Sequence, residues 1–467
     1  MTDVSAAIPG TRPTAACRSA KMIVPCERAR TILELSWPVI LALVAQNAMS
    51  LITIALVGRL GDAALAGIAV GGTVFSMMLA MLFALDTAVQ AAVARRAGAG
   101  DMPGMAAVLA DGVAISLPAG LLLAAAAYVG GPAVLAMMVD DPAVVATAID
   151  YLRALSPTLL FIGAGFAFSA YWNGRGMPAL PLRAICVQLP CHGALSYALI
   201  FGAFGCPRLD TAGAGLGAAA AALIALAVHI RLITRRASIS LRPMASGIAT
   251  LLSQGLPVSI QQAFLYAGVV VFFTIVARLG TREIAAANVM IALMLLSILA
   301  STGVGIAAAT LVGQALGRRD VPAVRRWGWD ASRVGALVVM PLSVAIMAAP
   351  HGTLALFVVD EATIDLAATP LRLMALSMCI DAVGRVLVFA LRGAGVAQVP
   401  AMITFALQWG AQLPLCWYVG VQLGHGLAGI AAVRLLLCAV ESTVMVAVWG
   451  RTLAALARKS SRRADRD

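Results

Sequence analysis

Long apolar stretches follow one another along this chain, each separated from the next by a short group of charged residues, glycine and proline. We predict that twelve of them are membrane-spanning helices, because about 20 apolar residues are needed to cross a hydrocarbon core of roughly 30 Å. The pattern therefore predicts an all-α polytopic membrane protein. The expected spans are 33–57, 65–93, 105–128, 149–172, 184–203, 214–233, 250–277, 285–312, 331–349, 367–391, 400–420 and 427–449.

The second half of the chain repeats landmarks of the first half at a constant offset of 219 positions. Such self-similarity predicts two copies of one structural unit. Each copy contains six expected spans, an even number, so the two copies are expected to enter the membrane from the same side. The matching pairs include Pro38 and Pro257, Gly61 and Gly280, Gly98 and Gly317, Asp101 and Asp320, and Pro103 and Pro322.

The repeat also suggests a division of the chain. In transporters with parallel repeats the substrate site lies near the membrane midplane between the two copies. A basic stretch that contains Ser and Pro separates the sixth expected span from the seventh. We expect an N-terminal tail at 1–31, an N-lobe at 32–233, an inter-lobe linker at 234–249, a C-lobe at 250–450 and a basic C-terminal tail at 451–467.

Composition and charge support a membrane protein. The chain is 61% hydrophobic and only 12% charged, with a mean hydropathy of +0.95, whereas charged residues make up about a quarter of an ordinary soluble domain. The net charge of +12 comes from Lys and Arg that gather in the tails and in the connections after even-numbered spans. This is the positive-inside pattern with both termini cytoplasmic, and we do not expect a nucleic-acid partner.

Other classes of function find little support. Residues 1–30 lack the apolar region of a cleavable signal peptide, so the first span is expected to act as the insertion signal. The eight cysteines are scattered and the four histidines are isolated, so neither a metal site nor a disulfide is expected. Gly98 and Gly317 are interpreted as left-handed helix caps. No phosphate-binding G-x-x-x-x-G-K-[ST] motif occurs, so we expect neither a cofactor nor direct ATP hydrolysis, and any pumping must use an ion gradient or a partner.

Several motifs resemble those of the multidrug and toxic compound extrusion (MATE) family of cation-coupled antiporters. The resemblance runs from about residue 32 to 450 and keeps the motifs in order in both halves. The motifs are Leu35-Ser36-Trp37-Pro38, Gln46-Asn47, Val57-Gly58-Arg59-Leu60-Gly61-Asp62, Val93-Ala94-Arg95-Arg96-Ala97-Gly98, Gly255-Leu256-Pro257, Gly303-Val304-Gly305, Gly313-Gln314-Ala315-Leu316-Gly317 and Leu391-Arg392-Gly393-Ala394-Gly395.

This resemblance implies two six-helix lobes that form a V, a cavity with alternating access, and export of organic cations in exchange for protons or sodium ions. It also implies a multi-pass protein of the bacterial inner membrane, without enzymatic activity. We expect a monomer. Two alternatives stay open: a flippase for lipids or lipid-linked oligosaccharides of the same architecture, and a membrane enzyme, for which the sequence shows no cluster of Asp or His residues.

Ionisable residues within spans are the first functional candidates, because a charge at membrane depth is costly. Asp381 lies about ten residues from the cytoplasmic end of its span and matches an acidic position that part of the MATE family uses for cation coupling. Arg385 follows one helical turn later, so an ion pair between the two is the structural alternative. Asp86, in the second span, is the other coupling candidate, since its copy in the second half is Gly305.

The chain departs from the family at Thr53, where the resemblance leads us to expect an acidic residue in the first span. Threonine does not titrate, so coupling there would have to pass to Asp86 or Asp381, with Thr53 contributing an oxygen. Met77, Met78, Met81, Met290, Met294 and Met374 are expected, with aromatic residues, to form an adaptable surface for apolar cations, or else plain core. The substrate cavity is expected to include Gln46, Asn47, Gln261, Gln262, Tyr266, Asn288 and Glu441.

Overall fold

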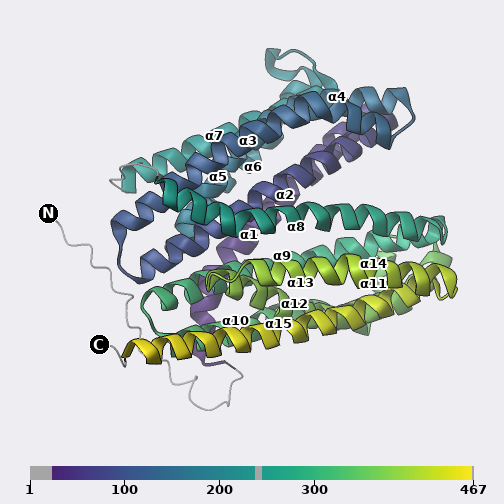
Figure 1. Ribbon diagram of the computed structural model, residues 1–467. Helices are drawn as coiled ribbons and strands as arrows, with labels where there is room; N and C mark the ends of the chain where they lie inside the picture. Colours follow the sequence, from purple (N-terminus) through teal and green to yellow (C-terminus); the bar gives the residue numbers. More distant parts are fainter. Residues whose placement is uncertain (1–23, 237–243, 359, 465–467) are drawn as a thin grey trace.

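The molecule is a bundle of long helices, seen from the side in Figure 1. The structure, a computed structural model, describes residues 24–236, 244–358 and 360–464. The expected tails and linker lie partly outside these ranges. The first half consists of α1 (Cys26–Val57), η2 (Gly58–Leu60), α2 (Asp62–Gly98), α3 (Met102–Met138), α4 (Pro142–Leu155), α5 (Pro157–Gly174), α6 (Ala179–Phe201), η3 (Ala203–Gly205) and α7 (Asp210–Arg236).

The second half repeats this order after the described residues resume at 244. It consists of α8 (Ala245–Ala277), α9 (Thr281–Gly317), α10 (Val321–Ala348), α11 (Pro350–Ala355), α12 (Glu361–Gly393), α13 (Gln398–Leu407), η4 (Gln408–Gln412), α14 (Leu413–Trp417), η5 (Tyr418–Gln422) and α15 (Gly426–Ala464).

The helices account for the expected spans. Within the described residues, ten helices are long and apolar enough to cross a membrane, and α4 with α5, bent by 42°, makes an eleventh. The remaining expected span, 400–420, is occupied by α13, η4, α14 and η5, which follow one another without a break. The segments η4 and η5 are π-helical and flank Pro414, which lacks a backbone N–H and cannot continue an α-helical ladder. The all-α membrane fold is therefore confirmed.

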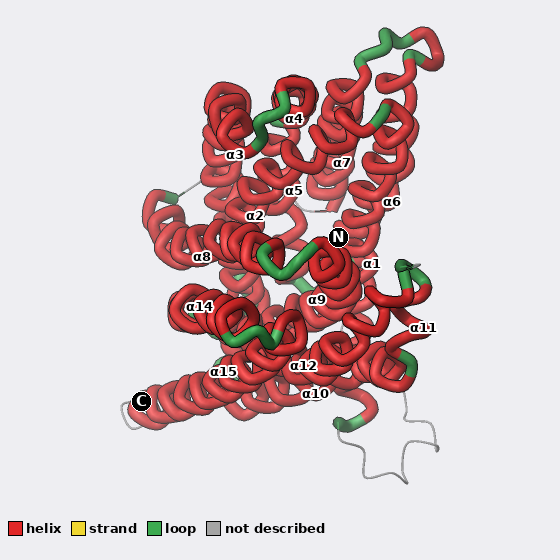
Figure 2. Tube along the Cα trace, turned by 90° about the vertical axis from the view of Figure 1, so that its right-hand side faces the viewer, coloured by secondary structure: helices red, strands yellow, loops and turns green. Residues whose placement is uncertain are grey.

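The first helix of each half crosses from one half to the other. The start of α1 belongs to a hydrophobic cluster of second-half residues, since Ile32 shares that cluster with Val312 and Trp449, and its end packs with first-half residues such as Ile200. The start of α8 packs with first-half residues through Leu251, and its end packs within the second half through Val276. In the end-on view of Figure 2, α1 and α8 lie between the two groups of helices on opposite sides.

The two halves meet at one end of the bundle, where α1 begins and α15 ends. We call this the terminal end, and the opposite one the far end. There the last turns of α2 and α9 cross at very short distance. A Cβ added at Gly98 would overlap the Gln314 carbonyl oxygen, and one added at Gly317 would overlap the Arg95 carbonyl oxygen. Toward the far end the helices of the two halves diverge (Figure 1).

Hydrogen bonds between the halves lie near this crossing and, between Ser259 and Met81, farther along α2 toward the far end. A small cavity beside them, lined by residues of α1, α9 and the α5–α6 connection, measures only about 10 Å³, which is room for about one water molecule. The crossing closes the terminal end between α2 and α9, while beside α8 the same end has a cavity of about 320 Å³ lined by Ser253, Gln254 and residues 395–399. The donors and acceptors are Gln90 Nε2 to the Ile306 carbonyl (2.9 Å), Thr310 Oγ1 to the Asn173 carbonyl (3.0 Å), Gln314 Nε2 to the Gly174 carbonyl (3.0 Å) and Ser259 Oγ to the Met81 carbonyl (2.8 Å).

The interpretation of Gly98 and Gly317 as left-handed caps is wrong. Both are the last residues of their helices, and the positive φ angles fall two residues later, at Gly100 (71°) and Arg319 (62°). Glycine is needed at the two earlier positions for the close approach of α2 and α9, since any side chain would meet the backbone of the other half.

Asp101 and Asp320, the acidic residues of the repeated motif, have a structural role. Each is the N-cap of the following helix: Asp101 accepts from the Gly104 N–H and Asp320 accepts from the Ala323 N–H, both at 2.8 Å. The Gly104 N–H, together with Arg96 at 2.6 Å, lowers the pKa of the exposed Asp101 carboxyl. The repeated Asp and Pro thus mark the starts of α3 and α10.

Candidate functional site

Asp381 and Arg385 form an ion pair on α12. Arg385 Nη2 lies 2.6 Å and Nε 3.1 Å from the same carboxylate oxygen, Asp381 Oδ2. The two side chains are 15% and 27% exposed, so the pair is largely withdrawn from solvent. The structural alternative considered for Asp381 is therefore present, with geometry set by the four-residue spacing on one helix.

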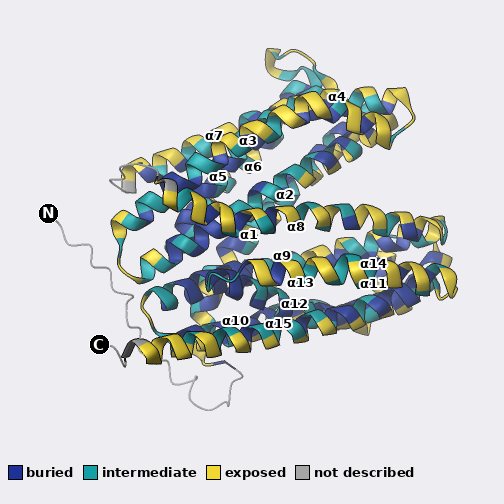
Figure 3. Ribbon diagram, viewed as in Figure 1, coloured by how far each residue is buried: buried dark blue, intermediate teal, exposed yellow. Residues whose placement is uncertain are grey.

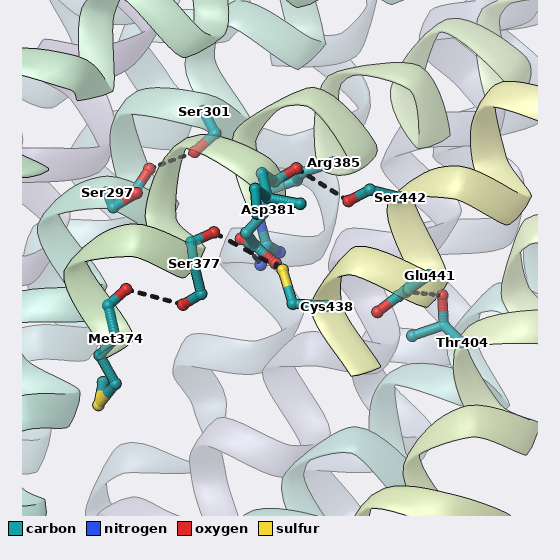
Figure 4. Close-up of polar contacts among 11 residues, drawn as sticks. Ser297, Ser301, Met374, Ser377, Asp381, Arg385, Thr404, Cys438, Glu441 and Ser442 are labelled. Atoms are coloured by element: carbon teal, nitrogen blue, oxygen red, sulfur yellow. Dashed lines mark hydrogen bonds and ion pairs between the residues drawn. The ribbon is translucent and has the colours of Figure 1, made fainter. Parts of the chain in front are cut away.

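Further polar groups surround this pair, as Figure 4 shows. Cys438 of α15 places its Sγ 4.0 Å from Asp381 Oδ1, and Arg434, one turn earlier, interacts electrostatically with the same carboxylate. Glu441 accepts a hydrogen bond from Thr404 Oγ1 of α13 at 2.8 Å and also attracts Arg385. The second half thus holds two carboxylates and two guanidinium groups close together, and their charges balance.

Asp86 occupies a different environment in α2. Its side chain is buried, with 8% of the residue exposed, and its Oδ1 atom has no hydrogen-bond partner within the described part of the chain. None of the ion pairs between described residues includes Asp86. A buried carboxylate without a cation beside it is costly while it is charged, and the protonated form removes that cost.

Thr53 lies in α1 opposite a histidine that the sequence did not single out. Its hydroxyl donates to the Met49 carbonyl at 3.1 Å and lies 3.0 Å from Nε2 of His192, on α6. Both residues are buried. The position where an acid was expected therefore carries a hydroxyl paired with a titratable imidazole. No periodic signal relates Thr53 to His192, because they are 139 residues apart.

The residues expected in the cavity do not form one cluster. On α1, Gln46 is half-buried and Asn47 donates to the Leu43 carbonyl of its own helix at 3.0 Å. On α8, Gln261 is buried with an unpartnered Oε1 atom, Gln262 is half-buried and Tyr266 is 40% exposed. Asn288 is exposed and donates to the Ile284 carbonyl. Only Glu441 lies beside the Asp381 pair (Figure 4).

The expected methionine surface needs correction. Met290, Met294 and Met374 are at most 6% exposed and lie in the apolar core of the second half. That core runs along α9 and α12, which carry many of the buried residues in Figure 3. Met77 remains 40% exposed and Met78 and Met81 are half-buried. Three of the six methionines therefore serve packing.

Breaking the ion pair from the arginine side is expected to destabilise the protein. In Arg385→Met the Asp381 carboxylate keeps its burial and loses its closest cation, at a cost on the order of 2 kcal/mol; complete burial would cost about 3–5 kcal/mol. Asp381→Asn with Arg385→Met should recover part of the loss. Thermal unfolding of the two variants and of Asp381→Asn measures the coupling; strictly additive effects would show that the pair contributes nothing.

Comparisons with known proteins agree with this architecture. The MatE family model matches residues 38–198 and again residues 257–418, so its two copies begin at Pro38 and Pro257 of the repeat. A probable multidrug resistance protein NorM of Bradyrhizobium diazoefficiens is 29% identical over 418 residues, which cover 85% of this chain and 88% of that protein. The multidrug resistance protein PmpM of Pseudomonas aeruginosa is 24% identical over 408 residues, covering 84% of each.

The fold is similar to solved structures. A crystal structure described as MATE in the bent conformation superposes with a TM-score of 0.86 at 19% sequence identity, covering 93% of this chain and 97% of that one. At this identity the likeness speaks for the fold alone. Because the family model matches both halves of the chain in register with the repeat, the chain belongs to the MatE family of membrane transporters.

Proposed function

We propose that this protein exports amphipathic organic cations from the bacterial cytoplasm by alternating access, in exchange for protons. The multidrug resistance names of its relatives support this cargo class. The distribution of Lys and Arg supports a cytoplasmic position for both termini in the inner membrane. With the terminal end closed and the far end diverging, the described state would then face outward (Figure 1).

The observation that carries the proton assignment is the buried Oδ1 atom of Asp86, which has no hydrogen-bond partner among the described residues, together with the absence of Asp86 from their ion pairs. A group that must alternate between proton and cargo needs to be free of a permanent partner. Asp86 meets this condition, whereas Asp381 is held by Arg385 at 2.6 Å. The contacts thus favour Asp86 over Asp381, the first candidate from the sequence.

A sodium ion finds less support than a proton. The described residues hold no group of three or more His, Cys, Asp or Glu side chains placed to bind a metal ion. Hard cations need several oxygen ligands at once, while a proton needs a single carboxylate. Coupling by H⁺ accordingly requires fewer binding residues than coupling by Na⁺.

An aromatic group on α8, α13 and η4 supports the cargo class. Phe264 packs edge-on against Phe405 at 5.1 Å and against Trp409 at 5.8 Å between ring centroids, and the Trp409 indole donates to the Phe264 carbonyl. Phe264 and Tyr266 remain 42% and 40% exposed. Aromatic faces attract organic cations by cation–π interactions, which tolerate varied shapes.

In the proposed cycle, cargo and proton compete for Asp86. A proton that enters from outside neutralises the carboxylate and releases the cation, and the protonated carrier returns inward and loses the proton to the cytoplasm. Neither ligand shifts the two states unless it binds one of them better. Competition at a single carboxylate provides that difference, while the Asp381 group keeps its own charges balanced.

Transport by the purified wild-type protein tests this function. In proteoliposomes, an imposed pH gradient is expected to drive accumulation of a fluorescent organic cation in the acidic compartment, and an equal Na⁺ gradient without a pH difference is not. Collapse of the pH gradient by an ionophore and protein-free vesicles are the controls. Movement driven by Na⁺ alone would contradict proton coupling. Absence of movement under either gradient would favour the flippase alternative, to be tested with a labelled lipid.

A further inference from the structure

Two buried acids that the proposed cycle does not use lie 219 positions apart. Asp111 is on α3 and Asp330 is on α10, and they are 3% and 4% exposed. They occupy equivalent positions in the two halves. Each carboxylate faces the first turn of the helix that crosses over from the opposite half: α8 for Asp111 and α1 for Asp330.

Asp111 binds the start of α8. Its Oδ1 accepts the Met244 backbone N–H at 2.6 Å, and Met244 is the N-cap of α8. The first N–H groups of a helix have no partner within the helix and carry partial positive charge. A Cβ added at Gly247 would overlap Asp111 Oδ2, so the absence of a side chain at Gly247 lets the carboxylate reach the backbone.

Asp330 binds the start of α1 in a different way. Arg28, in the first turn of α1, places Nη1 2.6 Å from Asp330 Oδ2, in an ion pair without well-directed hydrogen-bond geometry. Arg333, on the same helix as Asp330, lies 3.6 Å from the other oxygen. Arg28 and Gly247 are themselves 219 positions apart. The two halves thus bind the acid from equivalent positions, which carry a long cationic side chain in α1 and no side chain in α8.

We propose that Asp111 and Asp330, the bridging acids, are positioning residues for transport: they stabilise the state that is closed at the terminal end by binding α8 and α1 across the two halves. The inference rests on the proposed alternating access. Both contacts join elements of opposite halves, so separation of the halves at this end breaks both. Water can then solvate the released carboxylates, which keeps the closure reversible, unlike a contact between purely apolar surfaces.

Hydrogen–deuterium exchange of the full-length protein in nanodiscs tests the proposal without a transport assay. Residues 94–105 and 313–324 report on the terminal end, and residues 57–65 and 276–284 report on the far end. Asp330→Asn is expected to speed exchange at the terminal end roughly fivefold or more, with no increase at the far end. Equal acceleration at both ends would indicate general loss of stability and overturn the proposal.

Charge exchange provides the rescue. Arg28→Asp alone should open the terminal end, and Arg28→Asp with Asp330→Arg should restore slow exchange, since the pair is re-formed with opposite sign. Arg30→Asp is the matched control, because Arg30 is exposed and pairs only with Glu34 of its own helix among the described residues. A double variant that stays as open as the single one overturns the proposal.

The substitution Gly247→Ala tests the role of Asp111. Alanine favours a helix over glycine, so faster exchange at the terminal end must come from the overlap with Asp111. The effect should vanish in an Asp111→Ala background, and Gly450→Ala, a helical glycine in open space, should have none. An equal effect with and without Asp111 overturns the proposal. If exchange responds as expected but the wild type transports under neither gradient, the positioning role of the bridging acids is supported and the proposed function is contradicted.

Discussion

Asp86→Asn is expected to abolish export driven by a pH gradient and to leave the protein as stable as the wild type or more so. A difference of two pH units stores about 2.7 kcal/mol per proton, enough for a hundredfold accumulation of a singly charged cation. Asparagine has the shape of the protonated carboxyl group but does not titrate, so the variant should reach no accumulation. Removing an unpaired buried carboxylate also removes its cost in the charged form.

The matched control for this variant is Asp62→Asn, at the exposed start of the same helix, which should transport as the wild type does. Accumulation in proteoliposomes and thermal unfolding are measured on all samples. A structural role for Asp86 would appear as a lower Tm together with reduced transport. If Asp86→Asn still accumulates cation while Asp381→Asn does not, the coupling role belongs to Asp381.

Gly98→Ala is expected to prevent normal closure of the terminal end. The new methyl group would overlap the Gln314 carbonyl oxygen, and this backbone atom cannot rotate away. Overpacking of this kind costs about 1–3 kcal/mol, which corresponds to roughly a 5–150-fold fall in the ratio of closed to open states. Gly317→Ala should act in the same way, through the Arg95 carbonyl of the other half.

A cysteine at Ser259 reports this change, because Ser259 is 3% exposed and donates to the Met81 carbonyl across the halves. In a background without the eight native cysteines, a membrane-impermeant maleimide should label Ser259→Cys slowly, and much faster once Gly98→Ala is added. Gly72→Ala, in the same helix but with open space around the added methyl, is the control. Equal labelling rates in the three proteins would contradict a role of this crossing in closure.

The sequence predicted the helices well because apolar length is a local property. Each of the twelve expected spans falls on one helix or on consecutive helices, with a break at Ser156 and overruns of one or two residues at the ends of α6 and α10, and the constant offset of 219 predicted the two equivalent halves. The same offset relates Asp111 to Asp330 and Arg28 to Gly247, so the bridging acids could have been suspected from the register alone. The landmarks that reveal the repeat are Gly, Pro and the pair Asp101 and Asp320 at helix ends, whereas Asp111 and Asp330 lie inside α3 and α10.

The site was less predictable because it depends on contacts between distant residues. The Asp381–Arg385 pair follows from a four-residue spacing, but the isolation of Asp86 depends on what other helices place around it. The Thr53–His192 contact joins α1 to α6. The role of Gly98 was misjudged because a glycine beside a helix end is equally compatible with a cap and with close helix crossing, and only the partner backbone decides between them.

The crossing of α1 also bears on biosynthesis. Ile32, in its second turn, belongs to one hydrophobic cluster with Val312 and Trp449, which are synthesised hundreds of residues later. Contacts of such sequence separation form slowly, and segments that await a partner expose surface prone to misassembly. The start of α1 is therefore made long before the residues that complete its hydrophobic cluster, and it has to wait for them in the membrane.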